Sequence, residues 1–160
     1  MPIRHLQISG VRNLQPLTIT PHSGVNFIYG ENGSGKTSIL EAIAVMAAGK
    51  SFRTSQLKHV MSHDADRMEL RMSVEDLHRG ECELDSLRLK GGDHLLKQNG
   101  SVLTSQAEAA HWLPVQIIEP NTFKLLAGSP EERRQFIDWG VFHVEHGFMD
   151  QWKTFRKQLK

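Results

Sequence analysis

The sequence contains one eight-residue segment whose residue types and spacing suit the binding of phosphate groups. Residues 30–37 read Gly-Glu-Asn-Gly-Ser-Gly-Lys-Thr and fit the pattern G-x-x-x-x-G-K-[ST] of a phosphate-binding loop. A strand-like segment, 25–29, precedes it, and a helix-like segment, 37–48, follows it. This order of strand, loop and helix is the context that a functional loop requires, and a glycine-rich turn without a ligand is the alternative.

Each part of the segment has a chemical role in holding a nucleotide. Its glycines lack a Cβ atom, so main-chain N–H groups can surround phosphate oxygens, and the following helix directs its positive dipole end toward them. Lys36 supplies a charge for the β- and γ-phosphates, and Thr37 supplies a hydroxyl for Mg²⁺. The predicted nucleotide-binding residues are Gly30, Glu31, Asn32, Gly33, Ser34, Gly35, Lys36, Thr37 and Ser38, with Thr37 as the predicted metal ligand.

A complete hydrolytic site needs a second acidic residue at the end of a hydrophobic strand, where it holds Mg²⁺ and orients water. The nearest candidate is Glu119, which follows Ile117 and Ile118 and runs directly into Pro120. A plain strand end is the simpler interpretation of this short segment. We therefore expect nucleotide binding with little or no hydrolysis by this chain.

Periodicity along the chain predicts an α/β fold. Strands are expected at 3–9, 17–20, 25–29, 67–74, 82–89, 94–97, 101–103 and 115–118, and helices at 37–48, 105–112, 121–127, 129–140 and 148–160. Asn99-Gly100 predicts a hairpin turn, and a phase slip within 82–89 predicts a bulge. We expect a mixed sheet that carries the phosphate loop, with an antiparallel subsheet over 67–103. In the first long helix, Ile39, Leu40 and Ile43 are expected to share an apolar face.

The composition is that of an ordinary globular protein. The chain has 160 residues, a net charge of +1 and a single cysteine, which excludes an internal disulfide. It lacks a signal-peptide pattern and an apolar run of membrane-spanning length. These features predict a cytoplasmic protein. The apolar stripe of 148–160 still continues at the last residue, so we expect the chain to be part of a longer protein.

Several segments together resemble the RecF family of DNA replication and repair ATPases, a branch of the ABC-type and SMC-like ATPases. Val11-Arg12-Asn13-Leu14 is similar to the Phe-Arg-Asn-Tyr turn of that family, although aliphatic residues replace both aromatic ones. Residues 49–54, Gly-Lys-Ser-Phe-Arg-Thr, resemble its Gly-Arg-Ser-Phe-Arg segment. Residues 119–140 resemble its long block with Pro, Leu-Leu, Gly, Pro and Arg-Arg-x-Phe-Leu-Asp.

The resemblance implies a P-loop ATPase of the ABC head type. Residues 1–120 would form the ATP-binding lobe, and 121–160 would begin a helical lobe or arm. The family's signature segment and second acidic motif would lie beyond this chain. By the same resemblance, the full-length protein would be a weak ATPase that forms an ATP-dependent homodimer.

The resemblance also implies a biological role and partners. The family binds gapped DNA and acts with RecO and RecR to help load the RecA recombinase, which preserves replication and connects it to the SOS response. The cofactors implied are ATP and Mg²⁺. For the separate chain, both ATP and DNA binding are expected to be weak, because the opposing subunit's signature segment is missing and the net charge is small.

Three arginine positions have two interpretations each. By resemblance, Arg12 reaches the nucleotide phosphates; otherwise it is a surface residue after a strand. Arg53 either meets DNA phosphates or forms a salt bridge beside the helix. The pair Arg133-Arg134 stands near a helix start, where cations oppose the dipole, and indicates a structural partner or a phosphate.

Two other functions remain open from the residues alone. A small-molecule kinase would share the phosphate loop but would need a lid with arginines and a substrate pocket, whereas 67–103 predicts a sheet. A non-catalytic interaction module that retains the loop is the second. His143 and His146 stand three residues apart, but no third metal ligand is evident, so a solvated helix face is the simpler interpretation.

Overall fold

The computed structural model describes residues 2–118, 128–145 and 147–158. It divides into two compact units, residues 1–115 and 116–160. Within the described residues, no helix is both long and apolar enough to cross a membrane. The expected short helix at 121–127 and the side chain of Glu119 lie outside the described residues.

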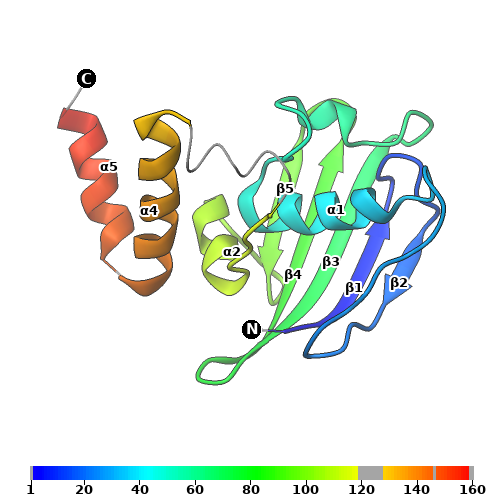
Figure 1. Ribbon diagram of the computed structural model, residues 1–160, viewed down its shortest axis with the longest axis horizontal. Coiled ribbons are helices and arrows are strands. Elements are labelled where there is room, and N and C mark those ends of the chain that lie inside the picture. The colour runs from blue at the N-terminus through cyan, green and yellow to red at the C-terminus, as the bar shows by residue number, and fades with distance from the viewer. Residues whose placement is uncertain (1, 119–127, 146, 159–160) are drawn as a thin grey trace. The chain divides into compact units, whose positions relative to one another are not determined.

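A six-stranded sheet forms the first unit, with strand order β2-β1-β3-β4-β5-β6 (Figure 1). The strands are β1 Ile3–Ser9, β2 Leu17–Ile19, β3 Arg67–Asp76, β4 Gly80–Leu89, β5 His94–Gln98 and β6 Ser101–Val102. Every pairing among them is antiparallel. The predicted antiparallel meander is therefore confirmed, including the turn at Asn99 and Gly100, both at positive φ.

Two helices cover one face of this sheet. Helix α1, Lys36–Ala48, crosses the strands, and α2, Gln106–Trp112, packs beside it (Figure 1). Helix α1 ends at Gly49 in the left-handed conformation, as its sequence predicts. Helix α2 begins at Ser105, whose side chain accepts a hydrogen bond from the N–H of Ala107. A short 3₁₀-helix, η1, Leu57–His59, follows α1.

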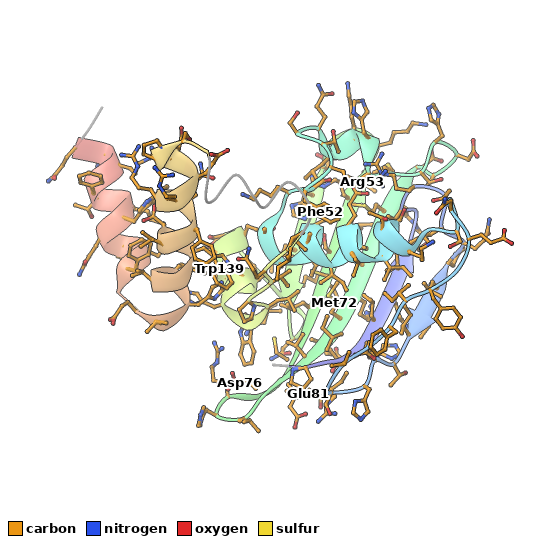
Figure 2. The ribbon with its side chains drawn as sticks, in the orientation of Figure 1. Phe52, Arg53, Met72, Asp76, Glu81 and Trp139 are labelled. Carbon is orange, nitrogen blue, oxygen red and sulfur yellow. The ribbon has the colours of Figure 1, made fainter. Side chains whose placement is uncertain are left out.

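The core lies between the helices and the sheet. Its fully buried side chains come from alternate positions of three strands and from the inner surface of α1. They include Leu6, Ile8, Met46, Met68, Leu70, Met72 and Leu84. Met72 is labelled on its strand in Figure 2.

The bulge falls in a different strand from the one predicted. The register of β3 and β4 is continuous from Arg67 to Asp76, and the buried Ser86 continues the inward alternation of Cys82 and Leu84. The irregularity lies instead in β1, between Ile3 and His5. This shift lets Ile3 pack against the core although it stands out of phase with Leu6 and Ile8.

Three further expectations are wrong. Residues 25–29 and 115–118 are not strands. A strand forms where a neighbour pairs its main-chain groups, and no described segment pairs with 25–29, whose Phe27 and Tyr29 remain 86% and 91% exposed. Leu40 is also exposed, because α1 turns its Ile39 and Ala42 positions toward the sheet.

The second unit contains two helices that contact each other, α4 Pro130–Val144 and α5 Phe148–Gln158. The predicted start of α4 is confirmed, since Ser129 and Glu132 form a capping box and Pro130 occupies the first turn. Trp139 (Figure 2) stacks on Phe136 and contacts His143 by its edge.

Candidate functional site

The phosphate-binding loop runs directly into α1. Gly30, Gly33 and Gly35 have φ values of 149°, 84° and 92°, which residues with a Cβ atom rarely adopt. Gly35 forms the N-cap, so the first N–H groups of α1 have no intrahelical partner. Residues 30–34 are exposed to solvent. The loop therefore presents accessible main-chain donors at a helix N-terminus, the arrangement that favours an anion.

Lys36 folds back over this loop. Its Nζ atom donates to the carbonyl oxygens of Gly30 at 2.8 Å and Glu31 at 2.7 Å. Both partners are neutral, so the ammonium charge has no carboxylate near enough to cancel it among the described residues. A phosphate bound to the loop would supply a charged partner at the same place.

A second segment supports the loop from the side. In the turn after β1, the Nδ2 atom of Asn13 donates to the carbonyl oxygen of Gly33 at 2.6 Å. The side chain of Leu14 fills the space next to Gly35, where an added Cβ atom would lie 2.3 Å from the Leu14 Cδ2 atom. Gly35 is thus required both for its backbone conformation and for this close contact.

The side chain of Arg12 binds a carboxylate on α1. Its Nη2 and Nε atoms lie 2.7 Å and 3.0 Å from the two carboxylate oxygens of Glu41, which is 0% exposed. Ser51 donates its hydroxyl to the same carboxylate at 2.5 Å, and Arg53 lies 3.3 Å from it. One buried carboxylate therefore joins the turn after β1 to the segment after α1, where Arg53 is labelled in Figure 2.

Charge and burial act on Glu41 in opposite directions. Burial alone would raise the pKa of this carboxyl group, but the hydrogen bonds from Arg12 and Ser51 and the charges of Arg12 and Arg53 outweigh it. The pKa of Glu41 is therefore below its ordinary value. The hydrogen bond to Glu41 raises the pKa of Arg12 against the opposing effect of burial. Both groups are ionised at neutral pH, and the salt-bridge interpretation of Arg53 is confirmed.

The two predicted hydroxyl donors differ in accessibility. Thr37 is exposed at the first turn of α1, whereas Ser38 is 4% exposed and faces the interior. A divalent cation held beside bound phosphates can reach Thr37 without rearrangement of the helix. The residues present thus fit ATP with Mg²⁺: the Lys36 ammonium suits the phosphates, and the Thr37 hydroxyl suits the metal.

Sequence reasoning missed Glu41 and Ser51. A signal was available, because Glu41 is the one charged residue within the stretch from Ser38 to Ala48. A charge on the buried surface of a helix needs a partner, and the arginines of the two flanking segments were the candidates.

Among the remaining candidates, Arg133 has a structural partner. Arg133 donates to the carbonyl oxygen of Gly128 at 3.0 Å, within its own unit. No cluster of three or more histidine, cysteine or acidic side chains suited to a metal occurs in the described part of the chain; His146 lies outside it. Arg79 stacks 4.5 Å above the ring of Trp112, and Arg156 stacks 5.1 Å above that of Trp152.

Comparisons with known proteins agree with this geometry. Residues 5–111 match the family model described as AAA domain. The whole chain is 41% identical to the DNA replication and repair protein RecF of Pseudomonas putida (strain GB-1) and 46% identical to that of Cellvibrio japonicus (strain Ueda107). It covers 44% of each of these relatives, so it spans less than half of their length.

Solved structures show the same fold. A structure of the recombination mediator protein RecF-ATP in the RecFOR pathway superposes with a TM-score of 0.84 and 26% identity, over 98% of this chain and 42% of that one. A structure from a study of ATP-driven dimerization and DNA-stimulated activation of SMC ATPases has a TM-score of 0.71 and 22% identity, over 87% of this chain and 99% of that one. The fold is therefore the P-loop fold of RecF and SMC ATPase heads.

Proposed function

Because the chain belongs to the AAA domain family and is homologous to proteins named RecF, we propose that it is the ATP-binding lobe of a DNA replication and repair ATPase. The observation that carries this proposal is the loop at Gly30–Thr37, which presents accessible main-chain donors and the Lys36 ammonium at the start of α1. ATP would lie with its phosphates on this loop.

Each residue has a defined part in this binding. The N–H groups of the loop would donate to phosphate oxygens, the Lys36 ammonium would exchange the Gly30 and Glu31 carbonyls for the β- and γ-phosphates, and Thr37 would hold Mg²⁺. Bound Mg²⁺ would neutralise charge that develops on the phosphates. The guanidinium of Arg12 is bound to Glu41. It would contact the phosphates only if it left Glu41 or bound both partners at once. Ser38 supports the helix start from its buried position.

The whole protein's role extends this proposal. Residues 1–120 form the ATP-binding lobe, and residues from 121 begin the helical lobe. The longer protein dimerises around ATP, hydrolyses it weakly, and acts in the cytoplasm at gapped DNA with RecO-type and RecR-type partners to help load the recombinase. The names of the relatives support the role in DNA replication and repair, and the name of the RecF-ATP structure supports ATP as the ligand and the RecFOR pathway as the setting.

Titration calorimetry with ATP and Mg²⁺ tests the nucleotide site. We expect weak binding by this chain, a loss of roughly tenfold or more in affinity for Lys36→Ala, and no loss for Lys153→Ala, a lysine exposed on α5. Equal affinity of Lys36→Ala and the unchanged chain would favour an interaction module instead. Rapid turnover, or phosphoryl transfer to a small acceptor, would favour a kinase and contradict the proposal.

A further inference from the structure

One tripeptide occurs twice in the chain, in two different structural settings. Residues 32–34 and 99–101 both read Asn-Gly-Ser; the first lies in the phosphate loop, and the second spans the turn between β5 and β6. Asn32 and Asn99 are the two asparagines of the sequence that a glycine follows. Because their local sequences are the same, a difference in their chemistry would come from the fold.

An asparagine followed by glycine can lose its side-chain amide without an enzyme, a reaction called deamidation. The main-chain nitrogen of the glycine attacks the Cγ atom of the asparagine, and the amide nitrogen departs as ammonia together with the proton of the attacking nitrogen. A succinimide ring results, and water opens it at either carbonyl carbon to give aspartate or isoaspartate. Glycine favours the attack because it has no Cβ atom to obstruct its nitrogen. The reaction therefore requires a side chain and an N–H group that are free to move together.

The fold holds the side chain of Asn99. Its Oδ1 atom accepts a hydrogen bond from the N–H of Glu83 at 2.8 Å, and its own N–H donates to the carbonyl oxygen of Glu83 at 2.9 Å. Gln98 and Ser101 pair on either side of the turn. The side-chain carbonyl of Asn99 thus takes the place of a main-chain acceptor in the pairing with β4, and its Cγ atom can approach the Gly100 nitrogen only after this hydrogen bond breaks.

The phosphate loop does not hold the side chain of Asn32. This side chain is exposed and, within the residues that the structure describes, makes no hydrogen bond. The N–H of Gly33 has no acceptor among the same residues, whereas the carbonyl oxygen of Gly33 is bound by Asn13. A loop that keeps its N–H groups free for an anion therefore also keeps the attacking nitrogen free.

Positive charge near Asn32 acts in the same direction. The Nζ atom of Lys36 lies 2.7 Å from the carbonyl oxygen of Glu31, which belongs to the peptide bond directly before Asn32. A nearby cation favours the deprotonated form of the attacking nitrogen and the negatively charged intermediate in which this nitrogen has bonded to Cγ. The features that suit a bound phosphate thus also suit the deamidation of Asn32.

We propose that Asn32 is a site of spontaneous deamidation, and that the fold protects Asn99 in the identical tripeptide. Isoaspartate at position 32 would add a methylene group to the main chain of the phosphate loop and displace the N–H groups that follow it. The chain would then lose its nucleotide site but keep its fold, because residues 30–34 are exposed. The loss of ATP binding rests on the proposed function, whereas the two rates of deamidation do not.

Peptide mapping by mass spectrometry tests the proposal on the 160-residue chain. The folded chain is incubated in mildly alkaline buffer, and tryptic cleavage after Lys36 and Lys97 places the two asparagines in separate peptides. We expect deamidation at Asn32 to be roughly fivefold faster or more than at Asn99, which is the effect on a rate of one hydrogen bond that must first break. In urea the two rates should be equal. Equal rates in the folded chain, no reaction at Asn32, or an unchanged ratio of rates in urea would overturn the proposal.

Titration calorimetry before and after incubation tests the consequence for the nucleotide. The fraction of the chain that binds ATP with Mg²⁺ should fall in proportion to the isoaspartate found at position 32. Asn32→Gln is the matched control, because the longer glutamine side chain closes a ring much more slowly, so its fresh and incubated samples should bind ATP alike. An equal loss in Asn32→Gln, or undiminished binding by the deamidated chain, would overturn the proposed inactivation. Fresh samples that bind no ATP would contradict the proposed function instead, and the rates at Asn32 and Asn99 would still decide whether the fold controls deamidation.

Discussion

Arg12 and Glu41 form a two-point ion pair between the turn after β1 and the middle of α1, with Nη2–Oε1 and Nε–Oε2 distances of 2.7 Å and 3.0 Å. The carboxylate is fully buried, and it also accepts hydrogen bonds from Ser51 and Arg53. A buried charge is tolerated only when its partners are in place. The pair therefore fixes the turn that contacts the phosphate loop.

Glu41→Gln should destabilise the chain. The amide retains the shape of the side chain but leaves the Arg12 guanidinium without its charge partner, and we expect a loss of about 2–3 kcal/mol in the free energy of unfolding. Urea denaturation at pH 7 measures it. Glu75→Gln is the control, because Glu75 pairs with Arg4 in an exposed position, where the expected loss is below about 1 kcal/mol. Equal losses in the free energy of unfolding for the two substitutions would show that the buried pair stabilises the chain no more than an exposed pair does.

Acid should weaken the fold through the same carboxylate. The pKa of Glu41 is lower in the folded chain than its ordinary value of 4.5, so the unfolded chain binds more protons as the pH falls. The contribution of Glu41 is complete above its unfolded pKa and is lost as the pH falls through the lowered folded value. The stability difference between the unchanged chain and Glu41→Gln should therefore shrink below pH ~4.5. A difference that stays constant from pH 7 to pH 3 would contradict this assignment.

Local patterns predicted the antiparallel strands and their turns. Alternation in β3 places Met68, Leu70 and Met72 on one face of the sheet, and a turn signal such as Asn99-Gly100 acts over a few residues. The glycines and Lys36 of the phosphate loop could be predicted equally well, because a nearly fixed sequence of residues creates that backbone shape.

Long-range pairings were not predictable in the same way. The strand expected at 25–29 depends on a partner that no local pattern identifies, and the described residues provide none. Glu41 accepts hydrogen bonds from Arg12, which is 29 positions away, and from Arg53, which is 12 positions away. These partners come together only once the chain is folded. The hollow lined by Arg12, Lys58 and Lys90 likewise combines three segments that are distant in the sequence.

Gly10→Ala should destabilise the chain strongly. Gly10 has a φ of 69°, and an added Cβ atom would lie 2.1 Å from the carbonyl oxygen of Arg67, a contact with rigid main chain that only movement of β1 or β3 could relieve. We expect a loss above about 2 kcal/mol, measured by thermal or urea denaturation. Gly91→Ala is the matched control, because nothing lies within 4 Å of its added Cβ atom and its φ is not in the strained range. Similar stability of the two variants would show that β1 shifts freely at this end.

Cys82 should react slowly in the folded chain. Its side chain is fully buried on β4, and burial raises the pKa of the thiol to about 11. Since the thiolate is the reactive form, only about one thiol in a thousand is ionised at pH 8, and reagent also lacks access. Ellman's reagent should therefore label the folded chain far more slowly than the same chain in urea, where the thiol regains an ordinary pKa. Fast labelling without denaturant would mean that β4 separates from β3 often enough to expose Cys82, and the continuous register of these two strands predicts the opposite.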